Sequence, residues 1–484
     1  MPTALRSRLC AMAIAAALSP GIAHATSPDS SAPMVHDIPE RWIFTPAHSQ
    51  TLPPDDEWWH GFNDPMLDSL ISEAVDRNYN VAIAARRIDA ANAAIMSARS
   101  SYFPMVGVSA SYDLSRRSGN LTAVPGPAVN SRALNLGVNA SWEIDLFGRV
   151  ASSVKEKKAL SGVARADYDA VMVSLCSSLA SAYMDLRASQ AQEAVVMSHL
   201  DNQKEVLRIT QERYKASLVS GLDVAQANTV YGSTLASLPS IRTSIASSIN
   251  AIALLLGRFP AEVDSLLSRP APVPVYSHIV STAVPAELLR RRPDIISAER
   301  TLAAQAAALG VARKEFMPTL SIQGSFGVEA RDPDNLFQKR SITYSVVPTL
   351  SWTVFDGFGR RAAVQEARAQ LEIALDSYHQ TVLSATSEVE NALSSYINAI
   401  DYVAQLEKVV DSAREEVNLS LAQYRSGLTL FTPVAQAQIT YLQYDDELVA
   451  ARASESRALI DLYRALGGGY GYSSADGSSS AIPK

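Results

Sequence analysis

An internal repeat constrains this chain more than any other feature, because two segments about 210 residues apart carry nearly the same pattern. Residues 80–112 align without a gap on residues 294–326, and the sequence that begins at Tyr214 matches the one that begins at Tyr424. Each copy reads as a helix, two strands, a very long helix, a turn and a further helix. Because neither copy could bury its apolar surface alone, the repeat predicts a symmetric architecture.

Local sequence signals predict how the chain is divided into parts. A secretory signal peptide is expected over residues 1–25, because Arg6 and Arg8 precede an apolar run and Ala23-His24-Ala25 is a small-x-small cleavage site. The other expected parts are an extended N-terminal segment (26–66), a first repeat (67–257), an inter-repeat or equatorial segment (258–284), a second repeat (285–466) and a flexible C-terminal tail (467–484).

Charge and cysteine content exclude several classes of protein. Removal of the signal peptide deletes two arginines and no acids, which takes the formal net charge from −7 to −9. A chain this acidic is a poor nucleic-acid binder, since binding to phosphates needs clustered Lys and Arg. Only Cys176 would remain after processing, so no intrachain disulfide is expected. No later stretch approaches 18 uninterrupted apolar residues, so we expect any membrane crossing to be made by strands.

Four segments alternate apolar and polar residues, which predicts strands with one apolar and one polar face. They span about residues 105–117, 132–146, 319–330 and 341–355, and each reaches the ~10 residues that a tilted strand needs to cross a bilayer. The smallest membrane barrels use about 8 strands, so copies of the chain would have to pool their strands. Three copies would supply 12. The alternative is two ordinary hairpins on a soluble core, but the rest of the chain offers no compact core.

Two predicted helices are too long for a globular domain. Residues 149–215 and 360–425 contain no proline, and a helix of about 65 residues would reach roughly 100 Å. Apolar residues step by three and four along the second of them, for example at Val403, Leu406 and Val410. That spacing is typical of a coiled-coil seam. A rod or scaffold coiled coil would explain these helices, although it would not explain the four strands between them.

The sequence gives no sign of an enzyme. The histidines are scattered and show neither metal-ligand nor catalytic-triad spacing. Glu388 and Glu390 lie two residues apart, on different faces of a predicted helix, so they do not form a working carboxylate pair. No glycine-rich phosphate loop is present. We therefore expect no catalytic residue, no cofactor and no bound metal.

Taken together, the motifs resemble those of the outer membrane factor family (TolC-like), and within it the NodT-type subgroup that serves resistance-nodulation-division efflux systems. The resemblance covers nearly the whole mature chain. The residues that carry it are Trp58-Trp59-x-x-Phe62-x-Asp64-Pro65-x-Leu67, the LLRRRPDI run of Leu288–Ile295, Ala312-Arg313-x-x-Phe316-x-Pro318, Phe355-Asp356-Gly357 and the YRALGGGY run of Tyr463–Tyr470.

The resemblance implies a mixed α+β membrane protein. Its long α-helical barrel of coiled coils would join a 12-stranded transmembrane β-barrel, which a homotrimer shares with four strands per chain. The protein would lie in the outer membrane of a Gram-negative bacterium, in contact with lipid, with a periplasmic extension. Many members of the subgroup carry a lipidated cysteine after the signal. This chain shows none in place, because Cys10 precedes the apolar run, so we expect an unlipidated N-terminus.

The function implied is the exit duct of a tripartite efflux pump. Such a duct passes drugs or other toxic compounds from an inner-membrane resistance-nodulation-division pump and a periplasmic adaptor (membrane fusion) protein to the exterior. A duct for type I protein secretion or for metal-ion efflux stays open as an alternative, and a trimeric structural surface rod is a more distant one. The sequence does not name the cargo, the pump or the adaptor.

The resemblance also points to a gate at the periplasmic tip, near the two predicted helical turns. The candidate gate residues are Asp223, Gln436, Thr432, Tyr214, Tyr424 and Arg425, and the candidate adaptor contacts are the turns at Gly221 and Gly427. The family often places an acid in the second turn helix, where this chain has Phe431-Thr432-Pro433.

Alternatives remain open for the acid and for the two tyrosines. Three copies of Asp223 would form a ring of carboxylates that favours cations, or Asp223 is a simple helix N-cap. For Tyr214 and Tyr424, packing in the buried seam is the alternative to a role in gating.

Overall fold

The structure is a computed structural model that describes residues 57–118, 120, 129–276 and 290–468, all within one compact unit. The predicted signal peptide, most of the predicted N-terminal segment and almost all of the predicted tail lie outside the described residues. The elements are η1 (Trp58–Phe62), α1 (Pro65–Arg77), α2 (Tyr79–Ser100), β1 (Met105–Arg117), β2 (Val129–Ile144), α3 (Arg149–Lys215), α4 (Gly221–Leu255), α5 (Pro260–Leu267), α7 (Pro293–Lys314), β3 (Thr319–Ala330), η3 (Pro333–Asn335), η4 (Lys339–Ser341), β4 (Ile342–Ser351), α8 (Gly359–Arg425) and α9 (Phe431–Ala465).

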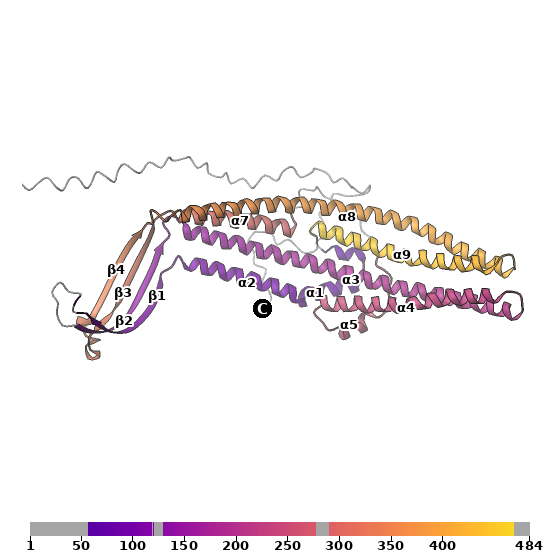
Figure 1. The fold of residues 1–484 in the computed structure, drawn as a ribbon, viewed down its shortest axis with the longest axis horizontal. Coiled ribbons are helices and arrows are strands. Elements are labelled where there is room, and N and C mark those ends of the chain that lie inside the picture. The colour runs from indigo at the N-terminus through magenta and orange to yellow at the C-terminus, as the bar shows by residue number, and fades with distance from the viewer. Residues whose placement is uncertain (1–56, 119, 121–128, 277–289, 469–484) are drawn as a thin grey trace, which may run out of the picture. The chain divides into compact units, whose positions relative to one another are not determined.

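The internal repeat is confirmed by the order and the length of these elements. The series α2-β1-β2-α3-α4 is followed by α7-β3-β4-α8-α9. Matching helices have equal lengths: α2 and α7 have 22 residues each, α3 and α8 have 67, and α4 and α9 have 35. Figure 1 shows the two series side by side, with α4 and α9 at the end away from the strands.

The four strands predicted from the sequence are present, and they form one antiparallel sheet in the order β1-β2-β3-β4. Apolar residues meet across all four strands, since Val138 pairs with Val108 and with Phe326, which in turn pairs with Tyr344. Polar residues occupy the opposite face, where the Asn139 amide donates to the Ser109 hydroxyl over 2.8 Å. The sheet therefore has the apolar face and the polar face that the alternation of apolar and polar residues predicts.

Two strands differ from the expected ranges. The second begins at Val129, three residues before the predicted start, and the fourth ends at Ser351 instead of near residue 355. Ser351 pairs with Thr319, the first residue of β3. Pro318 precedes Thr319 and lacks a backbone N–H, so β3 does not extend further, and among the described residues β4 pairs with no strand beyond this point.

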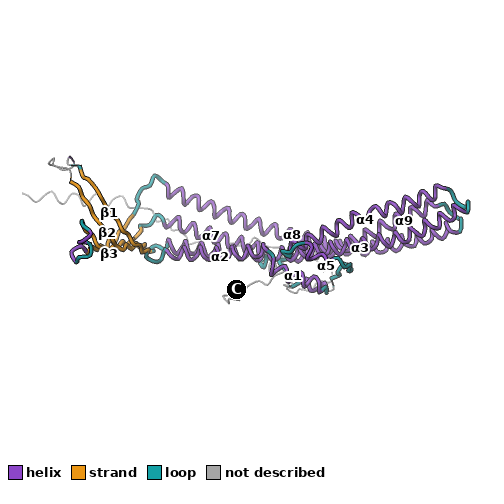
Figure 2. Tube along the Cα trace, turned by 90° about the horizontal axis from the view of Figure 1, so that it is seen from below, coloured by secondary structure: helices purple, strands orange, loops and turns teal. Residues whose placement is uncertain are grey.

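The long helix α3 is the centre of the packing. It contacts α1, α2, α4, α7 and α9, whereas α8 packs mainly against α7 and α9. In Figure 2 the helices α3, α4, α8 and α9 run together away from the strands. The predicted seam of α8 is confirmed, because Val403, Leu406 and Val410 are buried against α9.

Asn78 divides the helical region before the first strand into two helices, where the sequence predicts one helix before the strands. Asn78 ends α1, and its side-chain oxygen accepts hydrogen bonds from the backbone N–H groups of Asn80 and Val81, which start α2. Its amide nitrogen also donates to the carbonyl oxygen of Leu255 over 2.7 Å. An N-cap that is itself held by a distant helix thus makes a bend that helical periodicity does not reveal.

Two connecting segments are more regular than predicted. Residues 58–62, expected to be extended, form the short helix η1, which is almost entirely buried. The described part of the inter-repeat segment contains α5. Among the described residues no single helix meets the length and hydropathy test for a membrane span, although α4 and α5, bent by 120° at their junction, meet it jointly.

Candidate functional site at the helical tips

Both helical pairs turn back through the same hydrogen-bonded motif. The N–H of Leu218 donates to the carbonyl of Arg213 over 2.9 Å, and the N–H of Leu428 donates to that of Gln423 over 3.0 Å. Each turn needs one residue with positive φ, which is Gly427 (φ 73°) in the second repeat. The first repeat uses Ser217 (φ 60°) there, and Gly221 is instead the first residue of α4.

Replacing Ser217 with glycine is expected to raise the free energy of unfolding by roughly 0.5–1 kcal/mol. A side chain with a Cβ is strained at positive φ, and glycine removes that strain while adding some entropy to the unfolded chain. Guanidinium unfolding followed by circular dichroism would measure the change. Gly427→Ser is the matched control and should lower stability, so a destabilised Ser217→Gly protein would contradict the argument.

Asp223 and Tyr424 meet across the two repeats. The Tyr424 side chain is buried, and its hydroxyl donates to Oδ2 of Asp223 over 3.3 Å. Burial, together with the nearby Asp223 charge, raises the pKa of Tyr424, so the hydroxyl remains a donor. Asp223 is not the helix N-cap, which is Ser220; it is the third residue of α4 and accepts a hydrogen bond from the Ser220 hydroxyl over 3.1 Å.

Arg213 ties the end of α3 to the end of α8. Its Nη1 donates to the backbone carbonyls of Tyr424 and Arg425, both over 2.8 Å, and its guanidinium lies 5.0 Å from the centroid of the Tyr424 ring. Carbonyls in the last turn of a helix lack intrahelical partners, so a cation there is stabilising. Arg213 was not predicted from the sequence. A basic residue in a last helical turn is a weak signal, and it does not show which helix receives the bond.

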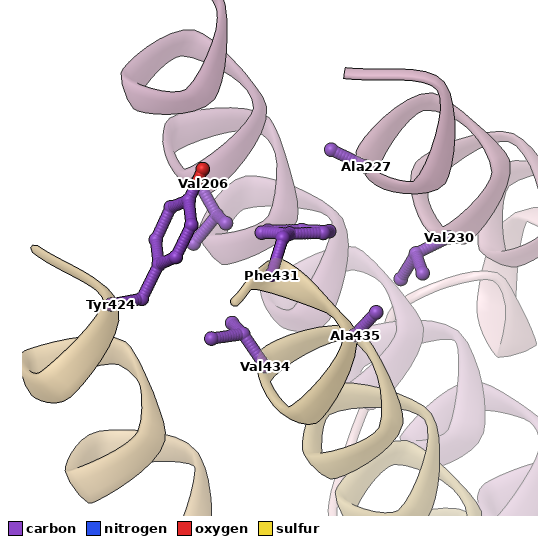
Figure 3. Packing of buried hydrophobic residues seen from close by; sticks show 7 residues of the cluster. All are labelled: Val206, Ala227, Val230, Tyr424, Phe431, Val434 and Ala435. Atoms are coloured by element: carbon purple, nitrogen blue, oxygen red, sulfur yellow. The ribbon is translucent and has the colours of Figure 1, made fainter. Parts of the chain in front are cut away.

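An apolar cluster holds these polar contacts in place (Figure 3). It brings together residues of α3, α4, α8 and α9, namely Val206, Ala227, Val230, Tyr424, Phe431, Val434 and Ala435. Phe431 is buried edge-on to Tyr424, with ring centroids 5.3 Å apart. The cluster excludes water from the tyrosine, which strengthens the hydrogen bond to Asp223.

The other candidate residues lie in different environments, and only some of them contact the second helical pair. Thr432 joins the junction, because the Gln226 amide donates to its hydroxyl over 3.2 Å. Gln436 contacts Thr440 of its own helix, with 3.4 Å between Nε2 and Oγ1. Arg425 contributes its backbone carbonyl, while its side chain is exposed. Tyr214, the counterpart of buried Tyr424, is 52% exposed, so seam packing within the chain is excluded for it.

Within the part of the chain that the structure describes, no cluster of three or more His, Cys, Asp or Glu side chains is arranged to hold a metal ion. The candidate site therefore consists of hydrogen bonds, one buried cluster and one cation at a helix end. Such an arrangement can hold two helical pairs together and release them. It contains no nucleophile paired with a base.

Comparison with known proteins identifies the family. The model of the outer membrane efflux protein family matches residues 70–258 and 284–468. "Nodulation protein T" of Rhizobium leguminosarum bv. trifolii is 29% identical over 413 residues, which cover 85% of this chain and 88% of that protein. "Antibiotic efflux pump outer membrane protein ArpC" of Pseudomonas putida is 27% identical over 450 residues, or 92% of each chain.

Solved structures agree with this assignment. The outer-membrane channel OprN superposes with a TM-score of 0.84 at 32% identity, over 90% of this chain and 98% of that one. The open-state MtrE outer membrane channel of Neisseria gonorrhoeae, at 24% identity, shares the fold with a TM-score of 0.79. The predicted resemblance is confirmed: this chain belongs to the outer membrane efflux protein family, whose members are transport channels and not enzymes.

Proposed function

We propose that this protein is the exit duct of a tripartite efflux pump, working as a homotrimer in the outer membrane of a Gram-negative bacterium. The observation that carries the proposal is the four-stranded sheet. Its outer strands β1 and β4 each pair on one side only among the described residues, and its apolar face is exposed, with Val108 at 76% and Tyr344 at 80%. Unpaired edges and an exposed apolar face are both costly unless further strands and lipid cover them.

Three copies would satisfy both requirements. Four strands fall short of the ~8 that the smallest membrane barrels use, and three chains would supply 12. The 67-residue helices α3 and α8, at 1.5 Å per residue, would extend roughly 100 Å from the barrel. That length suits a tunnel through the periplasm.

The helical tips would then form the gate and the docking site for the adaptor. Leu218 and Leu428 occupy equivalent turn positions and are 67% and 79% exposed, so they offer apolar contacts to a partner protein. Three copies of Asp223 near the narrow end would favour cations. An inner-membrane resistance-nodulation-division pump and a periplasmic adaptor are the partners that we propose, because the sequence motifs resemble the NodT-type subgroup. The similarity to "Antibiotic efflux pump outer membrane protein ArpC" supports a role in efflux.

Removing the bond between Tyr424 and Asp223 is expected to increase the single-channel conductance of the purified protein in planar bilayers. Asp223→Ala and Tyr424→Phe each delete one partner of a hydrogen bond to a charged group, worth about 1.5–3 kcal/mol. The closed state should lose stability relative to the open state by up to that amount. Asp223→Ala should also reduce cation selectivity in asymmetric salt.

Asp411→Ala is the control for this experiment, because Asp411 is an exposed acid on α8 whose nearest ion-pair contact, to Arg414, is 3.9 Å. It should leave conductance unchanged. Unaltered conductance in both tip variants would exclude the gating role. A detergent-free soluble rod without any conductance would favour the surface-rod alternative, while export of a protein or of metal ions by cells that carry the channel would favour the other two alternatives.

A further inference from the structure

Each repeat holds an exposed tryptophan at the point where its strands join its helices. Trp142 of β2 donates its indole N–H to the backbone carbonyl of Tyr102 over 2.9 Å. Trp352, one residue beyond β4, donates to the carbonyl of Phe316 over 3.1 Å. Tyr102 and Phe316 occupy equivalent positions in the two aligned segments. The same contact is thus built twice, and it fixes the orientation of rings that are 37% and 53% exposed.

Other exposed aromatic side chains lie at the same end of the sheet, where all four strands join helices (Figure 1). They are Phe103, Phe355 and Phe358. Trp142 lies on an inner strand, on the same face as Val138, so pairing at the edges of the sheet leaves its ring uncovered. Exposed apolar surface of this kind marks a contact site, and tryptophan is enriched where spanning segments meet lipid headgroups.

The residues beside these rings carry more cations than acids, although the chain as a whole has a formal net charge of −7. Segments 99–104, 142–149, 313–318 and 352–361 contain six cations and four acids, which are Arg99, Arg149, Arg313, Lys314, Arg360 and Arg361 against Glu143, Asp145, Glu315 and Asp356. This end of the sheet is therefore positive within an acidic protein.

Three of the four acids already have partners. Glu143 pairs with Arg149, with 2.8 Å between Oε1 and Nη2. Asp145 accepts hydrogen bonds from two backbone N–H groups at the start of α3, and Asp356 accepts one at the start of α8. These carboxylates are therefore used within the chain and do not neutralise the remaining cations.

The arginines, in contrast, are available to a ligand. Arg99, Arg313 and Arg361 are exposed, and none of them forms an ion pair with a described residue. Arg99 and Arg313 are equivalent in the repeat, and each lies one helical turn before a residue whose carbonyl holds a tryptophan: the N–H of Tyr102 donates to the carbonyl of Arg99 over 3.0 Å, and that of Phe316 to Arg313 over 3.4 Å. Both repeats thus place a free guanidinium next to a fixed indole.

We propose that the junction belt, formed by Arg99, Trp142, Arg313 and Trp352, binds anionic phospholipid in the leaflet nearest the helices. The phosphate would lie at the arginines and the acyl chains against the indole rings. The inference rests on the proposed barrel, which puts the apolar face of the sheet in lipid. A guanidinium matches the geometry of a phosphate, and cations close to a membrane surface attract anionic lipid. The belt also continues the apolar face of the sheet, which favours lipid over a protein partner.

Tryptophan fluorescence of the full-length protein in vesicles would test this preference. The vesicles contain equal amounts of phosphatidylglycerol and phosphatidylcholine, with bromine on the acyl chains of one lipid or of the other. Bromine quenches tryptophan on contact, so quenching should be stronger when phosphatidylglycerol carries it. Trp58 and Trp59 are buried and should contribute a constant background. Trp142→Phe with Trp352→Phe should abolish the lipid-dependent signal.

Arg99→Gln with Arg313→Gln should remove the excess quenching by phosphatidylglycerol, since each cation should enrich the anionic lipid beside it about fivefold at low salt. Arg291→Gln is the matched control. Arg291 is also exposed, but it precedes α7, whereas Arg313 lies in the last turn of that 22-residue helix, roughly 30 Å away. The control should keep the excess. High salt should weaken the excess in the parent protein, which tests the charge without a substitution.

The outcomes separate this inference from the proposed function. Equal quenching by the two brominated lipids would show a sheet in lipid without selection for anionic lipid, and the inference would be wrong. Loss of the excess in the Arg291 variant as well would mean that overall charge, and not the junction belt, attracts the lipid. Absence of quenching by either lipid would mean that the sheet does not face lipid, which is a failure of the proposed function itself.

Discussion

Replacing Trp58 with alanine is expected to lower the free energy of unfolding by about 3–5 kcal/mol, a loss typical of a large aromatic side chain removed from a core. The Trp58 side chain is 0% exposed. Its ring stacks on Tyr463 of α9, with centroids 5.5 Å apart and planes inclined by 8°, and it meets Phe62 edge-on at 6.3 Å. Guanidinium unfolding of the detergent-solubilised protein, followed by circular dichroism, would measure the effect.

The size of this effect reflects the position of Trp58 between the repeats. Asp64 follows η1 and is the N-cap of α1. It accepts a hydrogen bond of 2.7 Å from the hydroxyl of Tyr183 on α3, which belongs to the first repeat. Tyr463, on which Trp58 stacks, belongs to the second repeat. Residues 58–64 therefore join parts of the chain that are distant in sequence. Trp58→Phe keeps part of the stacking and should cost less than half as much. An alanine variant as stable as the parent would show that the segment merely covers the surface.

Replacing Arg292 with alanine is expected to cost about 2–4 kcal/mol, because it removes a buried cation that contacts three helices. Nη1 of Arg292 donates to the carbonyl of Ala465 in the last turn of α9 over 2.6 Å. Nη2 lies 2.7 Å from Asp294 at the start of α7 and 2.7 Å from Glu388 of α8. Burial disfavours the charged guanidinium, but the hydrogen bonds to both acids outweigh this and raise the pKa of Arg292.

The chain provides a matched control for this prediction in the same motif. Arg291 precedes Arg292 and is exposed, so Arg291→Ala should change the free energy of unfolding by less than about 0.5 kcal/mol. The same guanidinium titration would compare the two variants. Arg292→Lys is informative as well, since one ammonium group cannot reproduce the fork that spans both acids. If Arg291→Ala and Arg292→Ala lowered the free energy of unfolding equally, the stabilising role assigned to the buried Arg292 would be contradicted.

The repeat, the four strands and the two long helices could all be predicted from the sequence. Each depends on a local pattern, because the period of two in β3 or of three and four in α8 is set by how side chains alternate along the backbone. The split between α1 and α2 escaped prediction, since the capping Asn78 is held by the carbonyl of Leu255, 177 residues away.

Only part of the site at the helical tips could be predicted from the sequence. The place of Asp223 and Tyr424 beside the turns predicts that both belong to the site, and the structure brings them into contact. No sequence pattern indicates Arg213, which the structure adds to the site. Tyr214 and Tyr424 occupy equivalent positions with similar neighbours in sequence, so no local pattern could tell which one is buried. That depends on whether another helical pair of the same chain lies against each tyrosine. The sequence by itself therefore determined the repeating elements and their faces, and only the tertiary structure decided which faces meet, because burial is set by residues that are distant along the chain.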